Sequence, residues 1–117
     1  MNDRQLKNAI RILDRGLRFA RARISADITA QRLLILIAVY FNEGLSQRQL
    51  LEHLDSTSIT ALSRNLADLS ALTTKKQPGP GLLELRIDPL NLRVRRVFLT
   101  SKGRTFMRQW LQAAAAK

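Results

Sequence analysis

The amino-acid sequence predicts a mainly α-helical protein with one small β-hairpin, an α+β fold. Three observations lead to this prediction. Apolar residues recur at three- and four-residue spacing over most of residues 4–69 and again near the C-terminus, which is typical of helices. A segment rich in proline and glycine, residues 73–81, cannot continue a helix. Residues 82–99 then form two short runs of strand-favouring residues on either side of a turn sequence.

The N-terminal segment, residues 1–24, predicts a basic amphipathic helix. Leu6, Ile10, Leu13 and Leu17 form one apolar stripe, and the arginines and Lys7 lie largely off it. This pattern fits a surface helix that covers the core, a dimerisation helix, or a helix that lies on a membrane surface.

The next segment, residues 31–42, is apolar on nearly every side and predicts the central helix of the core. A cap is expected within Asp27–Thr29, and Gly44 suits the left-handed conformation that ends helices. Ser46 is followed three residues later by Gln49, which matches a capping box and predicts a short helix.

The residues Asp55–Thr57 are expected to break the short helix and to cap a further one, which has Ile59, Leu62, Leu66 and Leu69 on its buried side. Its outward residues are small, polar and nearly uncharged: Thr57, Ser58, Thr60, Ala61, Arg64 and Asn65. Such a face suits a helix that approaches base edges in the DNA major groove, whereas an ordinary exposed helix usually carries more Glu and Lys. Serine and threonine also gather at helix starts for capping alone, so a plain surface helix is the alternative.

The hairpin is expected to pair residues 82–87 with residues 94–99 around a turn at Asp88–Asn91. The alternation leaves the buried face undecided, because Arg95 shares one face with Val97 and Leu99. Cations gather in and beside the hairpin: Arg86, Arg93, Arg95, Arg96 and Lys102. Thr100 or Ser101 is expected to cap a last helix that carries Phe106, Trp110 and Leu111.

The composition indicates a polyanionic partner. The chain has 20 Lys and Arg against 9 Asp and Glu, a formal net charge of +11 on 117 residues. An apolar content of 45% can bury one modest core, so residues 1–117 are expected to form a single domain. The absence of cysteine excludes disulfides, thiolate metal sites and thiol-based redox sensing.

Neither a signal peptide nor a membrane span is expected. Cations interrupt the apolar runs of the N-terminal segment, and the longest apolar run, Leu33–Phe41, is far shorter than the roughly 20 residues that a spanning helix needs. We therefore expect a cytoplasmic protein without a membrane partner.

The order of these elements resembles that of the MarR-type winged helix-turn-helix regulators over roughly residues 29–104. The segments that carry the resemblance are Ser63-Arg64-Asn65-Leu66 with Leu69, Gly81-Leu82-Leu83, Asp88-Pro89 with Arg93, and Leu99-Thr100-Ser101-Lys102-Gly103. The chain departs from the family at the wing tip, where Leu90, Asn91 and Leu92 stand in place of further aspartate and arginine. One helix follows the wing where the family usually has two.

The resemblance implies a homodimer whose recognition helices enter successive major grooves of DNA and whose wings, here residues 82–99, reach the flanking minor grooves. Thr60, Arg64 and Asn65 would then read bases. The wing cations would neutralise phosphates. The dimer interface would involve the apolar residues of the terminal helices: Leu6, Ile10, Leu13, Leu17 and Trp110.

The expected function is that of a sequence-specific, double-stranded DNA-binding transcriptional regulator, most simply a repressor acting as a homodimer. One alternative is an architectural or accessory DNA-binding protein of plasmid or phage type. A second is a winged-helix adaptor whose basic N-terminal helix docks on an acidic protein.

No pattern indicates catalysis. His53 is the single histidine, and the carboxylates show no paired spacing. We expect no enzyme activity, no metal and no cofactor, and no residue pattern identifies a small-molecule effector.

Overall fold

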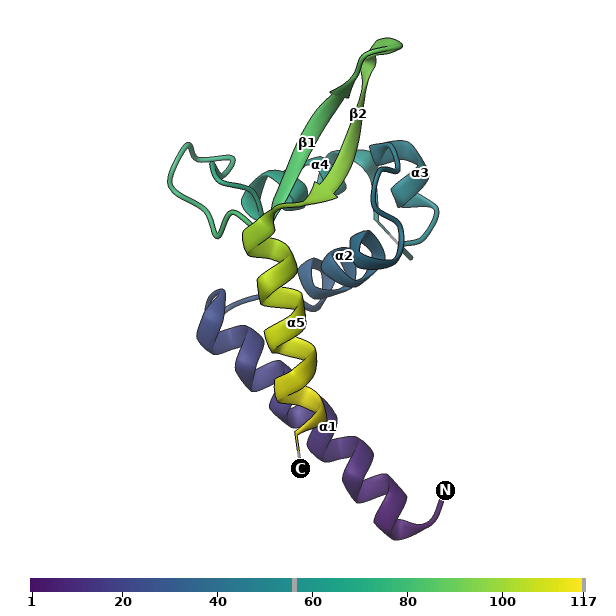
Figure 1. The fold of residues 1–117 in the computed structure, drawn as a ribbon, viewed down its shortest axis with the longest axis vertical. Coiled ribbons are helices and arrows are strands. Elements are labelled where there is room, and N and C mark those ends of the chain that lie inside the picture. The colour runs from purple at the N-terminus through teal and green to yellow at the C-terminus, as the bar shows by residue number, and fades with distance from the viewer. Residues whose placement is uncertain (56, 117) are drawn as a thin grey trace. The chain divides into compact units, whose positions relative to one another are not determined.

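The computed structural model describes residues 1–55 and 57–116 and confirms the mainly α fold with one hairpin (Figure 1). Its elements are α1 (Asp3–Arg23), α2 (Ala30–Phe41), α3 (Gln47–Leu51), α4 (Ile59–Asp68), β1 (Leu83–Asp88), β2 (Asn91–Leu99) and α5 (Ser101–Ala115). They form two compact units, one comprising Met1–Ile28 with the chain from Thr105 onward, the other Thr29–Arg104. The second unit coincides with the span over which the sequence resembles a winged helix-turn-helix protein.

The first unit is a pair of helices, α1 and the part of α5 from Thr105. The Trp110 indole Nε1 donates a 2.8 Å hydrogen bond to the carbonyl oxygen of Gly16, and the ring of Phe106 lies between those of Trp110 and Phe19, with centroids 5.6 and 5.9 Å away. Trp110 was expected at a dimer interface, but its side chain is buried inside the unit. A buried indole N–H needs an acceptor, and the glycine backbone supplies one at close approach.

The second unit has its core between α2, α4 and the base of the hairpin. Fully buried residues of α2 pack together with the buried face of α4 and with residues of the hairpin, and they include Leu36, Val39, Leu66, Leu83 and Leu99. The expectation that α2 is buried on nearly every side is wrong for its outer face, where Leu34, Tyr40 and Phe41 are 49–77% exposed.

The hairpin is antiparallel, and its register decides which face is buried. Leu83 lies opposite Leu99, Leu85 opposite Val97, and Ile87 opposite Arg95. The shared face is therefore apolar and buried at the base of the hairpin, while Ile87 is 57% exposed because the hairpin projects away from the helices towards its tip (Figure 1).

The segment that follows α2 anchors this hairpin. Gly44 has the expected positive φ, 89°, but α2 ends earlier, with Asn42 as its C-cap. The amide of Gly44 donates to the carbonyl oxygen of Val97, and the amide of Val97 donates to the carbonyl oxygen of Leu45, both at 2.9 Å. These bonds pair the start of the helix-turn-helix with β2, so the hairpin has a fixed position beside α3 and α4.

Candidate nucleic-acid interface

Helices α3 and α4 form the helix-turn-helix, and side-chain hydrogen bonds fix each of its helix starts. The expected capping box of Ser46 and Gln49 is present at α3. The cap of α4 is Ser58, whose Oγ accepts from the amide of Ala61 at 3.1 Å, so the expected cap within Asp55–Thr57 is wrong; Ser56 lies outside the described residues. Ser63 donates to the side-chain oxygen of Gln47 at 2.9 Å and ties the two helices together.

The outward face of α4 is narrower than expected. Ser58, Thr60 and Arg64 are exposed, whereas Thr57 and Ala61 are half-buried. Ile59, expected on the buried side, is 39% exposed because it stands in the first turn, before the helix meets the core. Within the described ranges, Arg64 makes no side-chain hydrogen bond or ion pair, so its guanidinium has all of its donors available.

Asn65 is half-buried and does not face outward, which corrects the expectation for this residue. Its Oδ1 accepts a 3.1 Å hydrogen bond from Arg32 Nε, and Arg32 Nη2 lies 2.8 Å from an oxygen of Asp68. The guanidinium of Arg32, at the start of α2, therefore holds two side chains of α4. Asn65 thus helps to position α4 against α2, and this contact leaves its side chain less available to a ligand.

Asp68 extends this network to the loop that follows α4. Its Oδ1 accepts from both the amide and the hydroxyl of Thr74 at 2.9 Å. The Thr74 amide, with smaller contributions from the Thr74 hydroxyl and from Arg32, holds the pKa of Asp68 below its ordinary value although partial burial acts in the opposite direction. The ionised carboxylate thus links the C-terminal end of α4 to residues 73–81.

A groove of about 440 Å³ lies between the helix-turn-helix and the hairpin. Its walls include Arg48 of α3, Ser63 of α4, and Arg93 and Arg95 of β2, and none of its lining residues is acidic. An anionic ligand placed there would meet guanidinium groups from two sides. Arg48 did not stand out in the sequence, because a single arginine in a short helix carries no motif.

The five cations expected to serve the wing divide into two groups. Arg93, Arg95 and Lys102 are exposed. Arg86 instead pairs with Glu84 and lies 4.1 Å over the ring of Phe98, and Arg96 binds the carboxylate of Asp88.

Arg96 has a structural role in the wing. Its guanidinium donates to Asp88 at 2.9 and 3.1 Å and to the carbonyl oxygen of Gly44 at 3.0 Å, so it joins the hairpin tip to the end of α2. The amide of Leu90, and then Arg96, hold the pKa of Asp88 below its ordinary value. The expectation that Arg86 and Arg96 are free for phosphates is therefore corrected: both are engaged inside the wing.

In the first unit, the apolar stripe of α1 points away from its partner helix. Leu6, Ile10, Leu13 and Leu17 are 45–65% exposed, whereas Gly16 and Ala20 are buried. A continuous apolar stripe of this kind is typical of a surface that another protein covers.

The described part of the chain offers neither a metal cluster nor a membrane-spanning helix. Residues 1–55 and 57–116 contain no group of three or more His, Cys, Asp or Glu side chains placed to hold a metal ion. Every helix in these same ranges is too short or too polar to cross a bilayer.

The fold and this surface define a winged helix-turn-helix protein, and solved structures share the fold. No protein-family model matches the chain, and no curated protein matches it. It is similar to the transcriptional repressor CouR bound to a 23-mer DNA duplex, with a TM-score of 0.67 at 21% identity over 96% of this chain and 71% of that one. It is also similar to the PcaV transcriptional regulator from Streptomyces coelicolor in complex with its natural ligand, with a TM-score of 0.58 at 23% identity over 96% of this chain and 69% of that one.

A third similar structure is a mutant of MepR from S. aureus, with a TM-score of 0.59 at 20% identity over 97% of this chain and 76% of that one. The protein therefore shares the winged helix-turn-helix fold of these structures, which confirms the fold that the sequence resemblance implies.

Proposed function

We propose that this protein is a sequence-specific, double-stranded DNA-binding transcriptional regulator that acts as a homodimer and represses transcription by occupying its site. The observation that carries the proposal is the polar, arginine-lined groove between α4 and the wing, beside the exposed start of α4. The similarity to CouR, a repressor solved on a DNA duplex, supports double-stranded DNA as the partner.

Base reading is assigned to Thr60 and Arg64, the exposed side chains of α4 that follow its cap. Phosphate contact is assigned to Arg93 and Arg95 on the wing and to Arg48 on α3, which flank the groove. Phosphate contacts supply affinity and register, whereas a bidentate arginine contact with guanine supplies sequence preference.

The experiment that tests base reading measures fluorescence anisotropy with two duplexes, the protein's own upstream DNA and a scrambled duplex of equal length. If the upstream DNA shows no preference, a duplex recovered from a random library by the wild-type protein takes its place. Loss of one bidentate base contact is worth about 1–3 kcal/mol, so Arg64→Ala should weaken binding to the preferred duplex by roughly 5- to 150-fold and binding to the scrambled duplex much less.

The matched control is Arg108→Ala, which removes the same charge from an exposed position in the other unit. It should leave the ratio of the two affinities unchanged. An equal loss on both duplexes for Arg64→Ala would refute base reading by this residue.

The homodimer is proposed on the uncovered apolar stripe of α1, and its test is light scattering at micromolar concentration. Leu13→Glu places a charge in the middle of the stripe and should convert a dimer to a monomer. Ala22→Glu, at an exposed position outside the stripe, should leave the mass unchanged. A wild-type protein with the mass of a monomer would refute the dimer.

A second candidate, an architectural DNA-binding protein, is favoured by the net charge of +11. It requires equal affinities for the two duplexes that fall together and steeply with salt. The alternative of a protein-binding adaptor requires that no duplex binds even at low salt.

A further inference from the structure

We infer that the loop after α4 and the adjacent Lys102 form a second binding site for the DNA backbone, separate from the wing. We call this surface the lysine shoulder and define it as residues 73–81 with Lys102. Its ligand is the phosphate groups of the duplex that the proposed function assigns to α4, and the inference rests on that function.

Hydrogen bonds and one close backbone contact fix the conformation of the loop in the lysine shoulder. Asp68 at the end of α4 accepts two hydrogen bonds from Thr74, as described above, and the amide of Thr73 donates to the carbonyl oxygen of Gln77 at 2.9 Å. On the return path, the amide of Gly79 donates to the carbonyl oxygen of Ala71 at 2.9 Å. A Cβ added to Gly79 would lie 2.2 Å from the carbonyl oxygen of Ser70, so the loop is closed tightly against the chain that leaves α4. The backbone at its tip is therefore held in place.

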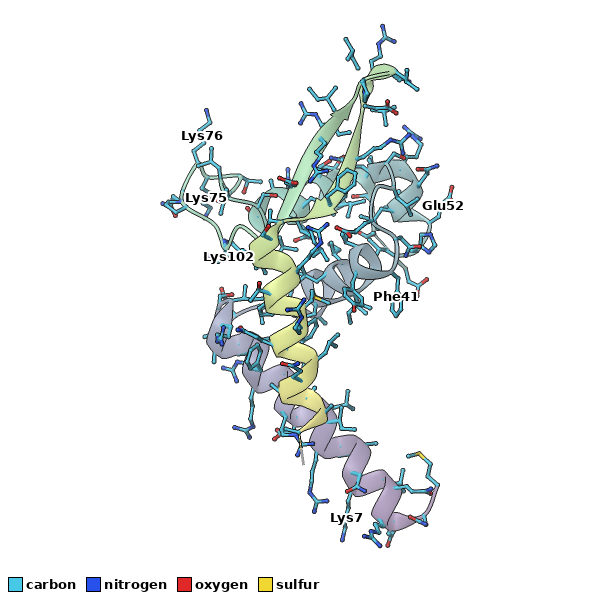
Figure 2. The ribbon with its side chains drawn as sticks, viewed as in Figure 1. Lys7, Phe41, Glu52, Lys75, Lys76 and Lys102 are labelled. Carbon is cyan, nitrogen blue, oxygen red and sulfur yellow. The ribbon has the colours of Figure 1, made fainter. Side chains whose placement is uncertain are left out.

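That tip presents two lysines. Lys75 and Lys76 are exposed, and Lys76 has a φ of 57°, the left-handed conformation that a non-glycine residue adopts at a constrained turn. Lys102 lies at the other end of the loop, beside Gly81. Its Cδ is 4.0 Å from the place that a Cβ would occupy if Gly81 carried one. Figure 2 shows all three lysines on the same side of this unit. Within residues 1–55 and 57–116, none of the three forms an ion pair.

The charge along the helix-turn-helix is asymmetric. Glu52 and Asp55 lie at the opposite end, after α3, where both are exposed and neither forms an ion pair in the described part of the chain. Figure 2 shows Glu52 on the side of the unit away from Lys75. A polyanion that crosses α4 is therefore attracted by the lysines at one end and repelled by the two carboxylates that follow α3 at the other.

The dimensions of α4 place the lysine shoulder at the edge of a major groove. A helix of 10 residues is roughly 15 Å long, and the major groove is about 12 Å wide. When the exposed first turn of α4 lies in the groove, its C-terminal end reaches the phosphate backbone that borders the groove. The wing and the lysine shoulder then contact the duplex at two separate stretches of backbone.

The test is the salt dependence of DNA binding for the double variant Lys75→Gln/Lys76→Asn in the full chain. Asparagine is used at position 76 because it tolerates a positive φ, which protects the loop conformation. Each lost phosphate contact makes the negative slope of log K against log salt concentration shallower by about 0.9, so the double variant should have a slope that is shallower by about 1.8. Affinities for the selected and scrambled duplexes should fall by the same factor, because phosphate contacts carry no sequence information.

The control is Lys7→Gln/Arg108→Gln, which removes two exposed cations from the other unit. A slope that changes equally in the two double variants, or that stays at the wild-type value in the shoulder variant, would overturn the inference and leave the proposed function intact. Failure of the wild-type protein to bind any duplex would overturn both. Hydroxyl-radical footprinting gives an independent readout: the shoulder variant should lose protection of one backbone stretch and keep that of the wing.

Discussion

Gly103→Ala is expected to destabilise the protein, although alanine favours helices more than glycine does. Gly103 lies in the first turn of α5, where its amide donates to the hydroxyl of Thr100 at 2.9 Å. The Thr100 hydroxyl donates in turn to the carbonyl oxygen of Gly81 at 2.6 Å, and the Thr100 amide donates to the carbonyl oxygen of Leu82 at 3.0 Å. These contacts give a physical reason for the Leu-Thr-x-x-Gly sequence that closes the wing.

The magnitude follows from the space around Gly103. A Cβ at this position would lie 2.0 Å from the carbonyl oxygen of Leu82 and 3.2 Å from Leu99 Cδ2. Ordinary carbon–oxygen contacts are about 3.3–3.6 Å, and the obstructing oxygen belongs to the backbone, so the strand and helix must separate. Overpacking costs about 1–3 kcal/mol, and a clash this close with backbone belongs at the upper end, about 3 kcal/mol. The higher helix propensity of alanine offsets about 1 kcal/mol of that cost, which leaves a net loss of about 2 kcal/mol.

The assay is urea unfolding at fixed protein concentration, with Gly16→Ala as the matched control. A Cβ on Gly16 would meet Ala114 Cβ at 3.4 Å and Trp110 Nε1 at 3.6 Å, which are ordinary van der Waals contacts. The same substitution should therefore be neutral or stabilising by up to about 1 kcal/mol in α1. A Gly103→Ala protein as stable as the wild type would refute this account of the wing base.

Two further outcomes are expected. Because the pKa of Asp68 is lowered in the folded state, its contribution to stability is fully present above its unfolded-state pKa of about 3.9 and is lost as the pH falls through the folded-state value. Asp68→Asn should therefore lower the free energy of unfolding at pH 7 and differ less from wild type at pH 3; a gap that widens in acid would contradict this assignment. Trp110→Phe should lower the free energy of unfolding by about 1–2 kcal/mol, because it removes the indole N–H that donates to the carbonyl oxygen of Gly16, and thermal or urea unfolding that shows no change would count against that hydrogen bond.

Local signals in the sequence were sufficient for the order and type of the elements. The capping box at Ser46 and the turn at Asp88–Asn91 each depend on residues within a few positions of one another, and the structure confirms both. Gly44 has the expected positive φ, but α2 ends two residues before it, at the cap Asn42. The exact cap of α4 was missed by one residue, because several neighbouring polar residues can each cap a helix.

The candidate interface was predicted less well, because its side chains compete for partners that are distant in the sequence. Arg64 and Asn65 are adjacent, yet Asn65 is bound by Arg32, which lies 33 residues away. In the same way, Arg95 is exposed while Arg96 turns towards Asp88 and Gly44. The periodicity of a helix or strand predicts which face a side chain lies on. It does not predict whether that side chain binds a residue of another element.

The sequence by itself determined the fold class, the basic character of the chain and the polar start of α4, since these follow from composition and short-range spacing. Only the tertiary structure decided which cations remain available to a ligand. Arg86 and Arg96 are held by carboxylates of the wing, Trp110 is enclosed between two helices, and the lysines of residues 73–81 join Lys102 on one surface. The physical reason is that a hydrogen bond or ion pair depends on the positions of both partners, and chain folding sets those positions over long sequence separations.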